Sequence, residues 1–261
     1  MNDESIGYLG ALLLGVVQGL TEFLPVSSSG HLALSRHLFG IDMKNAITFD
    51  LLLHLATVLV VIRFFWNDIR GLWGRDRVVV GYLVVATIPA GIIGILLRDV
   101  FENIEKSPLA LGGALMCTAG FLWLSERYTE SKHSIRTMGL HNAFIIGMAQ
   151  ALAVTPGISR SGLTLTGGII CGVAREDAFR FSFLMMVPVV TGAAFLDILK
   201  HHDEITTIVN GPLALGFLAA MVTGHFALQL LQKVVLGRRL RVCSVYCLVI
   251  GLVAVVTSLV F

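Results

Sequence analysis

Apolar residues form long uninterrupted blocks along this chain, separated by short polar segments. Strands of a membrane barrel would alternate apolar and polar positions, so the blocks indicate α-helices. Six blocks are long enough to cross about 30 Å of hydrocarbon as single helices. The six predicted spans are Ile47–Phe65, Val78–Leu97, Leu109–Leu124, Phe181–Leu199, Leu213–Leu231 and Val242–Phe261.

Two further apolar blocks are interrupted near their centres. The first runs from Ile6 to Leu38 and is broken at Pro25–Gly30, and the second, residues 142–173, is broken at Pro156–Gly162. Each flanking arm has about 10 to 17 residues, which is short for a full crossing. We therefore favour a re-entrant helix hairpin at each break over an ordinary span with a kink.

The two breaks are related by a shift of 132 residues, which carries position 27 onto position 159. The pattern predicts two repeats within a single membrane domain of residues 1–261, at about 6–125 and about 138–261, each a re-entrant hairpin followed by three transmembrane helices. Three crossings is an odd number, so the second repeat would enter from the opposite face, with inverted topology. The superimposed polar or glycine pairs include Gln18 and Gln150, Ser27 and Ser159, Ser29 and Ser161, and Gly30 and Gly162.

Composition supports an all-α integral membrane protein. Hydrophobic residues make up 56% of the chain and charged residues 14%, against about 25% charged in soluble domains, and the mean hydropathy is +0.83. These values exclude a soluble globular enzyme, a disordered chain and a disulfide scaffold. A net charge of +2 indicates no nucleic-acid partner. All four cysteines lie in apolar stretches, where we expect small buried side chains.

Charge in the loops predicts the orientation, because basic residues gather on the cytoplasmic side. On the side of the termini we count five basic residues: Arg36, Lys44, Arg98, Lys106 and Lys200. The other side carries thirteen: Arg63, Arg70, Arg75, Arg77, Arg127, Lys132, Arg136, Arg175, Arg180, Lys233, Arg238, Arg239 and Arg241. Both termini would therefore face outward, and the first hairpin would dip in from the outer face.

Ionisable and hydroxyl side chains concentrate in the first break. Ionisable groups at membrane depth cost about 2.5–3.5 kcal/mol on insertion scales and are functional by default. Gln18 and Glu22 are spaced i, i+4 and would share one helix face, where their oxygens suit Mg²⁺ or Ca²⁺. His31 is a candidate general acid or base, or an interfacial histidine. Ser28 is a candidate nucleophile or oxyanion donor.

Serines precede a short helix in both breaks, and a helix N-terminus binds anions. Ser27 and Ser29 would serve either this site or as ordinary N-caps. Arg160 adds a planar cation suited to phosphate oxygens, or a structural ion pair with Glu22. The spacing predicts an intramembrane anion site. It does not distinguish a phosphatase from a transporter or lipid flippase. Inverted repeats are also typical of transporters, so the second alternative stays open.

At these two segments the chain resembles the bacterial undecaprenyl-diphosphate phosphatase family of the bacitracin-resistance type. The first family motif stands here as Gln18, Glu22, Pro25-Val26-Ser27-Ser28 and Gly30-His31. The second, Pro-Gly-x-Ser-Arg-Ser-x-x-Thr, runs from Pro156 to Thr164. The resemblance extends over essentially the whole chain.

The resemblance implies hydrolysis of undecaprenyl diphosphate to undecaprenyl phosphate and inorganic phosphate. This reaction recycles the lipid carrier for cell-wall synthesis, confers bacitracin resistance and depends on Mg²⁺ or Ca²⁺. It also implies a bacterial inner-membrane protein whose site opens to the periplasm. The implied residue roles are Glu22 and Gln18 for positioning of the metal or water, Ser28 as nucleophile or phosphate contact, His31 for proton transfer, and Arg160 for the diphosphate. Substrate binding is implied for Gln18, Ser27, Gly30, Ser159, Ser161 and Thr164.

Gln18 stands where many members of that family carry an acid, so a metal site with two carboxylates is in doubt unless another acid joins. Asp50 is the nearest candidate, with His54 one turn further on. An interfacial aspartate and a hydrogen-bonded histidine explain this pair equally well. The oligomeric state is open and includes a homodimer.

Overall fold

The computed structural model describes residues 6–41, 46–129, 131–200 and 211–260. Within these ranges the chain is helical, and the one strand-like contact is an isolated bridge between His133 and Val173. Lys44 and Phe261, which belong to the predictions above, lie outside the described residues, as do both extreme ends. The helices are α1 (Tyr8–Phe23), α2 (Ser28–Phe39), α3 (Ala46–Phe64), α4 (Trp66–Leu72), α5 (Arg77–Leu96), α6 (Arg98–Glu105), α7 (Pro108–Ser125), α8 (Gly139–Leu152), α9 (Arg160–Ile170), α10 (Arg175–Lys200), α12 (Gly211–Leu236) and α13 (Leu240–Val260).

Helices α5, α7, α10, α12 and α13 are long and apolar enough to cross a membrane, which confirms five of the six predicted spans. The sixth, α3, meets the same test only together with α4, and the two helices meet at a bend of 77°. Helix α10 begins at Arg175, earlier than predicted, because Glu176 and Asp177 in its first turn suit the helix dipole although they are polar. The chain is therefore an all-helical, multi-pass membrane protein.

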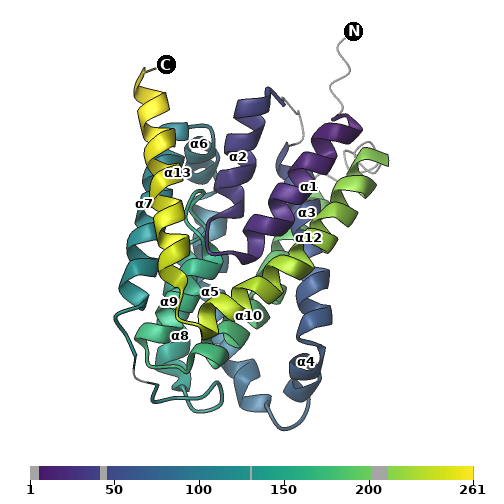
Figure 1. Ribbon diagram of the computed structural model, residues 1–261. Helices are drawn as coiled ribbons and strands as arrows, with labels where there is room; N and C mark the ends of the chain where they lie inside the picture. Colours follow the sequence, from purple (N-terminus) through teal and green to yellow (C-terminus); the bar gives the residue numbers. More distant parts are fainter. Residues whose placement is uncertain (1–5, 42–45, 130, 201–210, 261) are drawn as a thin grey trace.

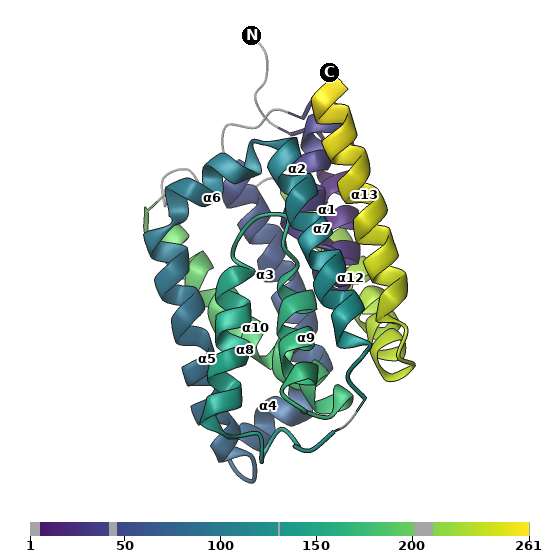
Figure 2. The ribbon, with the colours of Figure 1, turned by 90° about the vertical axis from the view of Figure 1, so that its left-hand side faces the viewer.

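The two broken blocks each form a pair of short helices. Helices α1, α2, α8 and α9 have 16, 12, 14 and 11 residues. At 1.5 Å per residue each is at most about 24 Å long, which is less than the hydrocarbon thickness. The outer ends of α1 and α2 lie where α13 ends (Figure 1). Figure 2 shows α8 and α9 entering from the opposite end, with the segment that joins them directed toward the end that holds α6.

Glycines allow each hairpin to pack closely on a long helix, as small residues do in membrane proteins. Helix α1 packs on α12 and α8 packs on α5. A Cβ on Gly15 would lie 2.7 Å from Gly216 Cα, and a Cβ on Gly147 would lie 2.7 Å from Ala86 Cα. Both approaches are backbone to backbone, so no flexible side chain can yield.

We expect Gly15→Val to lower the stability of the protein by about 2 kcal/mol, because the added atoms overpack the α1–α12 contact. Gly113→Val is the matched control, because it makes the same change in helix α7 where a Cβ meets no heavy atom within 4 Å. Thermal unfolding of both variants in detergent provides the measurement. Equal losses in the two variants would contradict the packing argument.

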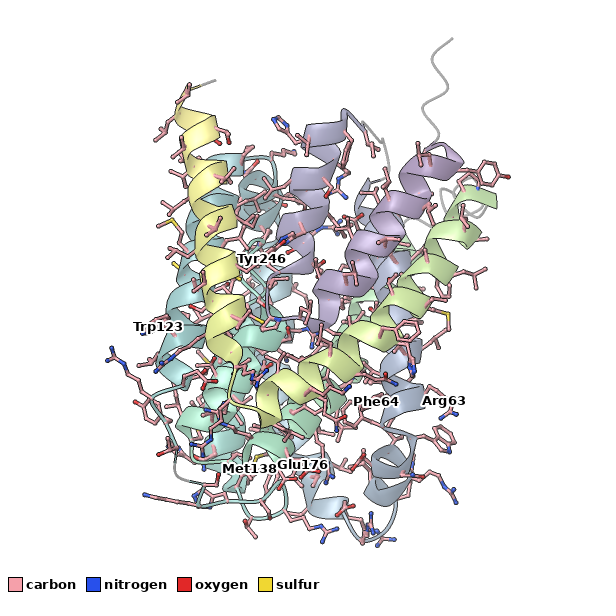
Figure 3. All side chains as sticks on the ribbon, viewed as in Figure 1. Arg63, Phe64, Trp123, Met138, Glu176 and Tyr246 are labelled. Carbon is pink, nitrogen blue, oxygen red and sulfur yellow. The ribbon has the colours of Figure 1, made fainter. Side chains whose placement is uncertain are left out.

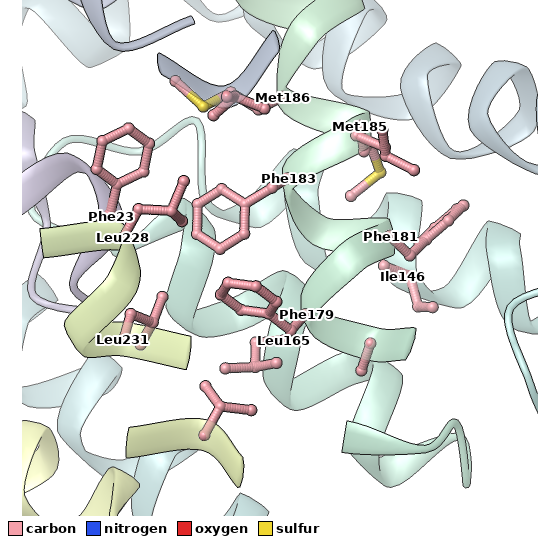
Figure 4. Close-up of a cluster of buried hydrophobic side chains, with 14 of the residues drawn as sticks. Phe23, Ile146, Leu165, Phe179, Phe181, Phe183, Met185, Met186, Leu228 and Leu231 are labelled. Atoms are coloured by element: carbon pink, nitrogen blue, oxygen red, sulfur yellow. The ribbon is translucent and has the colours of Figure 1, made fainter. Parts of the chain in front are cut away.

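A buried aromatic cluster lies between the first break and the start of α4. Phe179 and Phe183 of α10 pack edge to face at 5.1 Å, Phe23 lies 5.7 Å from Phe183, and Phe65 lies 5.5 Å from Phe179. Figure 4 shows Phe23, Phe179 and Phe183 of this cluster with the aliphatic side chains around them. The cluster fixes the last turn of α1, which carries Glu22, against α10.

The expectation that all four cysteines are buried is wrong for Cys117, which is exposed. Cys243 and Cys247 are buried, and Cys171 is intermediate. Cys117 lies in the middle of the long apolar helix α7. In a membrane-spanning helix an apolar side chain can face lipid, so apolar surroundings in the sequence do not imply burial in the protein.

Candidate functional site

Glu22 is the centre of the site. Its carboxylate lies on the last turn of α1 and is buried, with 3% of the side chain exposed. Its Oε2 accepts hydrogen bonds from Ser28 Oγ at 2.5 Å and Gln18 Nε2 at 3.1 Å. His54 Nε2 lies 3.2 Å from the same oxygen, and Arg160 NH2 donates to Oε1 at 2.7 Å. One carboxylate thus joins four elements, α1, α2, α3 and α9.

The local sequence explains why Ser28 and Arg160 reach this carboxylate. Ser27 is the N-cap of α2 and accepts from Gly30 N at 3.3 Å, so Ser28 is the first residue of the helix. Ser159 is the N-cap of α9 and accepts from Gly162 N at 3.1 Å, so Arg160 is the first residue of that helix. The capping alternative is therefore confirmed for Ser27 and wrong for Ser29, which lies inside α2, while Ser159 caps α9 in the same way.

The two breaks touch each other. A Cβ on Gly30 would lie 3.2 Å from Gly157 Cα, and a Cβ on Gly162 would lie 3.3 Å from Pro25 Cβ. Ser161 Oγ also donates to the carbonyl of Leu24 across the contact, at 3.4 Å. The close approach brings the N-termini of α2 and α9 to one place, and a side chain at either glycine would require its neighbours to shift.

The electrostatic balance at Glu22 favours the binding of a further anion. Arg160 is a fixed cation. His54 Nδ1 lies 2.7 Å from the Asp50 carbonyl and its Nε2 faces the Glu22 carboxylate. Both neighbours are acceptors, so this geometry suits an imidazolium. Two cations around one carboxylate leave a positive excess, and Arg160 NH1 is buried without a hydrogen-bond partner among the described residues.

Asp50 does not contact Glu22. Its Oδ2 accepts from Arg36 NH1 at 2.5 Å, and Arg36 NH2 donates to Glu105 at 2.6 Å. This ion triad joins α2, α3 and α6. The sequence did not point to Glu105, because α6 is short and carries no motif. The pair of Asp50 and His54 is therefore divided between two clusters, since His54 faces Glu22 and Asp50 faces Arg36.

A divalent cation would find few protein ligands here. Within the described ranges no group of three His, Cys, Asp or Glu side chains is placed to hold a metal ion. Gln18 Oε1 is nevertheless buried without a hydrogen-bond partner in that part of the chain. It lies on the same residue that donates to Glu22. These oxygens fit an ion held by one carboxylate and shared with substrate phosphates, as Mg²⁺ commonly is, and not an all-protein cage.

His31 lies outside the Glu22 network. Its Nδ1 is 2.8 Å from the Ser27 carbonyl, and its Nε2 is 2.9 Å from the hydroxyl of Tyr246. The two rings stack, with centroids 5.6 Å apart and planes 12° from parallel. Sequence reasoning missed Tyr246, whose only signal is a polar tip inside the apolar helix α13.

The remaining predicted site residues support the start of α9. Ser159 N donates to Thr118 Oγ1 of α7 at 3.0 Å, and Ser159 Oγ lies 3.2 Å from Ser161 Oγ. Thr164 Oγ1 donates to the Arg160 carbonyl at 2.8 Å and lies 2.5 Å from Ser182 Oγ. Thr164 thus contacts the backbone of Arg160 and not its guanidinium.

Comparison with known proteins places the chain among a large set of relatives. Its residues 11–253 match the model of the family described as bacitracin resistance protein BacA. A protein of Methanosphaera stadtmanae named undecaprenyl-diphosphatase is 37% identical, over 97% of this chain and 98% of its own length. Proteins of the same name from Halothermothrix orenii and Carboxydothermus hydrogenoformans are 37% and 38% identical, over 96% and 94% of this chain and 98% and 95% of their own lengths. The match covers both breaks and every helix described above from α2 to α12, so the chain belongs to the bacitracin resistance protein BacA family.

Proposed function

We propose that this protein is a bacterial inner-membrane phosphatase that hydrolyses undecaprenyl diphosphate to undecaprenyl phosphate and inorganic phosphate. The observation that carries the proposal is the Glu22 carboxylate, held between the Ser28 hydroxyl and the Arg160 guanidinium where two helix N-termini meet. The relatives named undecaprenyl-diphosphatase supply the substrate class. In the cell this reaction would recycle the lipid carrier and confer bacitracin resistance.

The diphosphate would bind at the N-termini of α2 and α9, where free backbone N–H groups and helix dipoles favour anions. Arg160 NH1, which has no partner among the described side chains, would donate to phosphate oxygens. Ser27, Gly30, Ser159, Ser161 and Thr164 would shape this binding surface, mainly by ordering the two helix starts.

The chemistry would begin at Ser28. Its Oγ attacks the terminal phosphorus, and its proton passes to Glu22 Oε2, which lies 2.5 Å away. The bond from phosphorus to the bridging oxygen breaks, and undecaprenyl phosphate leaves. Water then attacks the phosphorus of the phosphoserine and releases a proton to solvent, the bond from phosphorus to Ser28 Oγ breaks, Glu22 returns its proton to that oxygen, and inorganic phosphate leaves. His31 would carry a proton through Nε2, because Nδ1 is engaged by the Ser27 carbonyl.

A bound Mg²⁺ or Ca²⁺ would neutralise charge on the phosphate oxygens as a Lewis acid. Glu22 and Gln18 would hold it. Because Gln18 is an amide, Glu22 would be the one carboxylate of this pair of ligands. His54 would keep the Glu22 carboxylate oriented from the side of α3. Gln18 and His54 would hold Glu22 in one position while Arg160 binds the phosphate of the substrate.

We also propose that the two halves form an inverted-topology repeat of re-entrant hairpins and spans. The shift of 132 residues carries α1 onto α8 and α5 onto α12. It therefore turns the α8–α5 packing into the α12–α1 packing, and the structure contains both. The contacts at the breaks obey the same rule, since Gly30 meets Gly157 and Gly162 meets Pro25. The opposite entry of the two hairpins in Figures 1 and 2 supports the inversion.

The site would open toward the periplasm. The described helix ends that carry most of the basic residues lie at the end of the molecule where α4 is found (Figures 1 and 2). The positive-inside rule makes this end of the molecule cytoplasmic. Arg63 and Glu176 lie near this end in Figure 3. The buried aromatic cluster lies between Glu22 and α4 and would separate the site from the cytoplasm.

The test is phosphate release from undecaprenyl diphosphate by detergent-purified protein, with Mg²⁺ or Ca²⁺ and with excess chelator. We expect release that depends on the added cation. Release at an equal rate in chelator would remove the metal from the proposal. No release by folded, cation-supplied protein would overturn the phosphatase assignment and leave only an anion site.

A further inference from the structure

We infer that Tyr246 is a positioning residue of the site, which fixes the orientation of the His31 ring through its Nε2. The inference rests on the proposed function for its effect on turnover, and on geometry alone for its effect on His31. Tyr246 lies on α13, more than 200 positions from His31 in sequence, and belongs to neither break. Figure 3 shows it at mid-height on α13, facing the helix that carries His31.

The hydrogen bonds define which ring nitrogen carries the proton. A backbone carbonyl only accepts, so His31 Nδ1 must be the donor to the Ser27 carbonyl at 2.8 Å. In the neutral ring Nε2 is then the acceptor, and the Tyr246 hydroxyl donates to it at 2.9 Å. The bond from Nδ1–H to the Ser27 carbonyl sets the tautomer, as such a bond does for other functional histidines. Nε2 is thus the basic nitrogen of His31, and the Tyr246 hydroxyl holds it in place.

Ring stacking holds the same pair in one orientation. The near-parallel planes, 12° apart, leave the imidazole little freedom to rotate about its last bond. Tyr246 is 43% exposed, so its ring forms an outer wall and not a part of the core. A side chain kept only for packing would be satisfied with phenylalanine here. The hydroxyl is the feature that packing does not require.

The pair also supports an unusual turn. Ser27 has φ +70°, a left-handed conformation that non-glycine residues rarely adopt and that costs about 1–3 kcal/mol. Its carbonyl accepts from His31, and the next residue is Ser28. Cys247, the neighbour of Tyr246, donates through Sγ to the Pro25 carbonyl at 3.5 Å. One turn of α13 therefore contacts the break twice, on both sides of the strained residue.

The decisive variant is Tyr246→Phe, which removes one oxygen and keeps the ring. We expect kcat to fall about 5- to 10-fold with KM within about twofold, as for the loss of one neutral hydrogen bond that positions a group. Tyr246→Leu should lose more, since the stacking is lost as well. Tyr128→Phe, just beyond the end of α7 and outside both breaks, is the matched control and should keep the parent kcat.

The direct readout is the nitrogen-15 spectrum of histidine-labelled protein in micelles near pH 8, where an ordinary imidazole is neutral. We expect His31, assigned by comparison with His31→Gln, to be a single Nδ1–H tautomer in the parent. Tyr246→Phe should move its Nε2 signal and Tyr128→Phe should not. An unchanged His31 spectrum together with an unchanged kcat would overturn the inference. The spectrum needs no substrate, so a failed phosphatase assay alone would count against the proposed function and not against the link between Tyr246 and His31.

Discussion

Arg160→Ala is expected to reduce kcat for phosphate release by about 10²–10³-fold, the usual cost of losing one preorganised donor to a transition-state anion. The guanidinium contributes twice in this site. Its NH1 has no partner among the described residues and would bind phosphate, while its NH2 neutralises the buried Glu22 carboxylate. The assay is phosphate release by purified protein under saturating substrate and cation.

Arg160→Lys separates charge from shape. A lysine restores the cation but offers a compact ammonium in place of a planar fork, so we expect an intermediate loss. Arg75→Ala is the control, because the Arg75 side chain is 71% exposed and far from the breaks in sequence. A folded Arg160→Ala protein that keeps kcat within a factor of a few would exclude the guanidinium from catalysis. Thermal unfolding checks the fold of each variant.

Ser28→Ala is expected to lower kcat by on the order of 10⁴–10⁶-fold. Losses of this size follow when the nucleophile of a serine protease, or a residue that activates it, is removed. The reason is geometric as well as chemical. Ser28 Oγ lies 2.5 Å from a carboxylate oxygen that can take its proton, and the serine begins a helix whose N-terminus binds anions. Acid-quenched turnover followed by peptide mass spectrometry should find phosphate on Ser28 in the parent protein.

Ser29→Ala is the matched control for this experiment. Its hydroxyl makes one contact among the described residues, 3.4 Å from Ser27 Oγ, so near-parent activity is expected. A residual Ser28→Ala rate only about 10- to 100-fold below the parent would indicate direct attack by water, with Ser28 as an oxyanion donor. Complete loss in Ser29→Ala would mean that the wrong serine has been assigned.

Much of the helical architecture was predictable because a bilayer imposes its thickness on the sequence. Five spans follow directly from apolar length, and the repeated Pro, Gly and Ser positions locate the two breaks. The bend between α3 and α4 was not predictable in this way. Hydropathy averages over the bend at Phe65, whereas the helices there turn by 77°. Apolar patterning records burial from water and not helix direction.

The site was predictable only as far as its residues lie in short motifs. Gln18, Glu22 and Ser28 are near neighbours in sequence, so their grouping needed only helix geometry. The contact of His54 with Glu22 depends on the packing of α3 beside α1, and Tyr246 reaches the first break from the far end of the chain. Such pairings are tertiary facts that no local spacing encodes. His31 shows the same limit, since its motif position did not reveal that its ring turns toward α13.

Ser28 and Arg160 are each the first residue of a helix that follows a serine cap, and the proposed repeat would give them equivalent places in its two halves. Two identical halves related by symmetry would bring either two hydroxyls or two guanidiniums to the central contact, and never one of each. Joining the halves in one polypeptide removes that restriction. In the proposed mechanism one copy would then supply the attacking group and the other its electrostatic counterpart. Val154 stands at the position that corresponds to Glu22 under the same shift, so the proposed repeat would carry the central carboxylate in one half and not in the other.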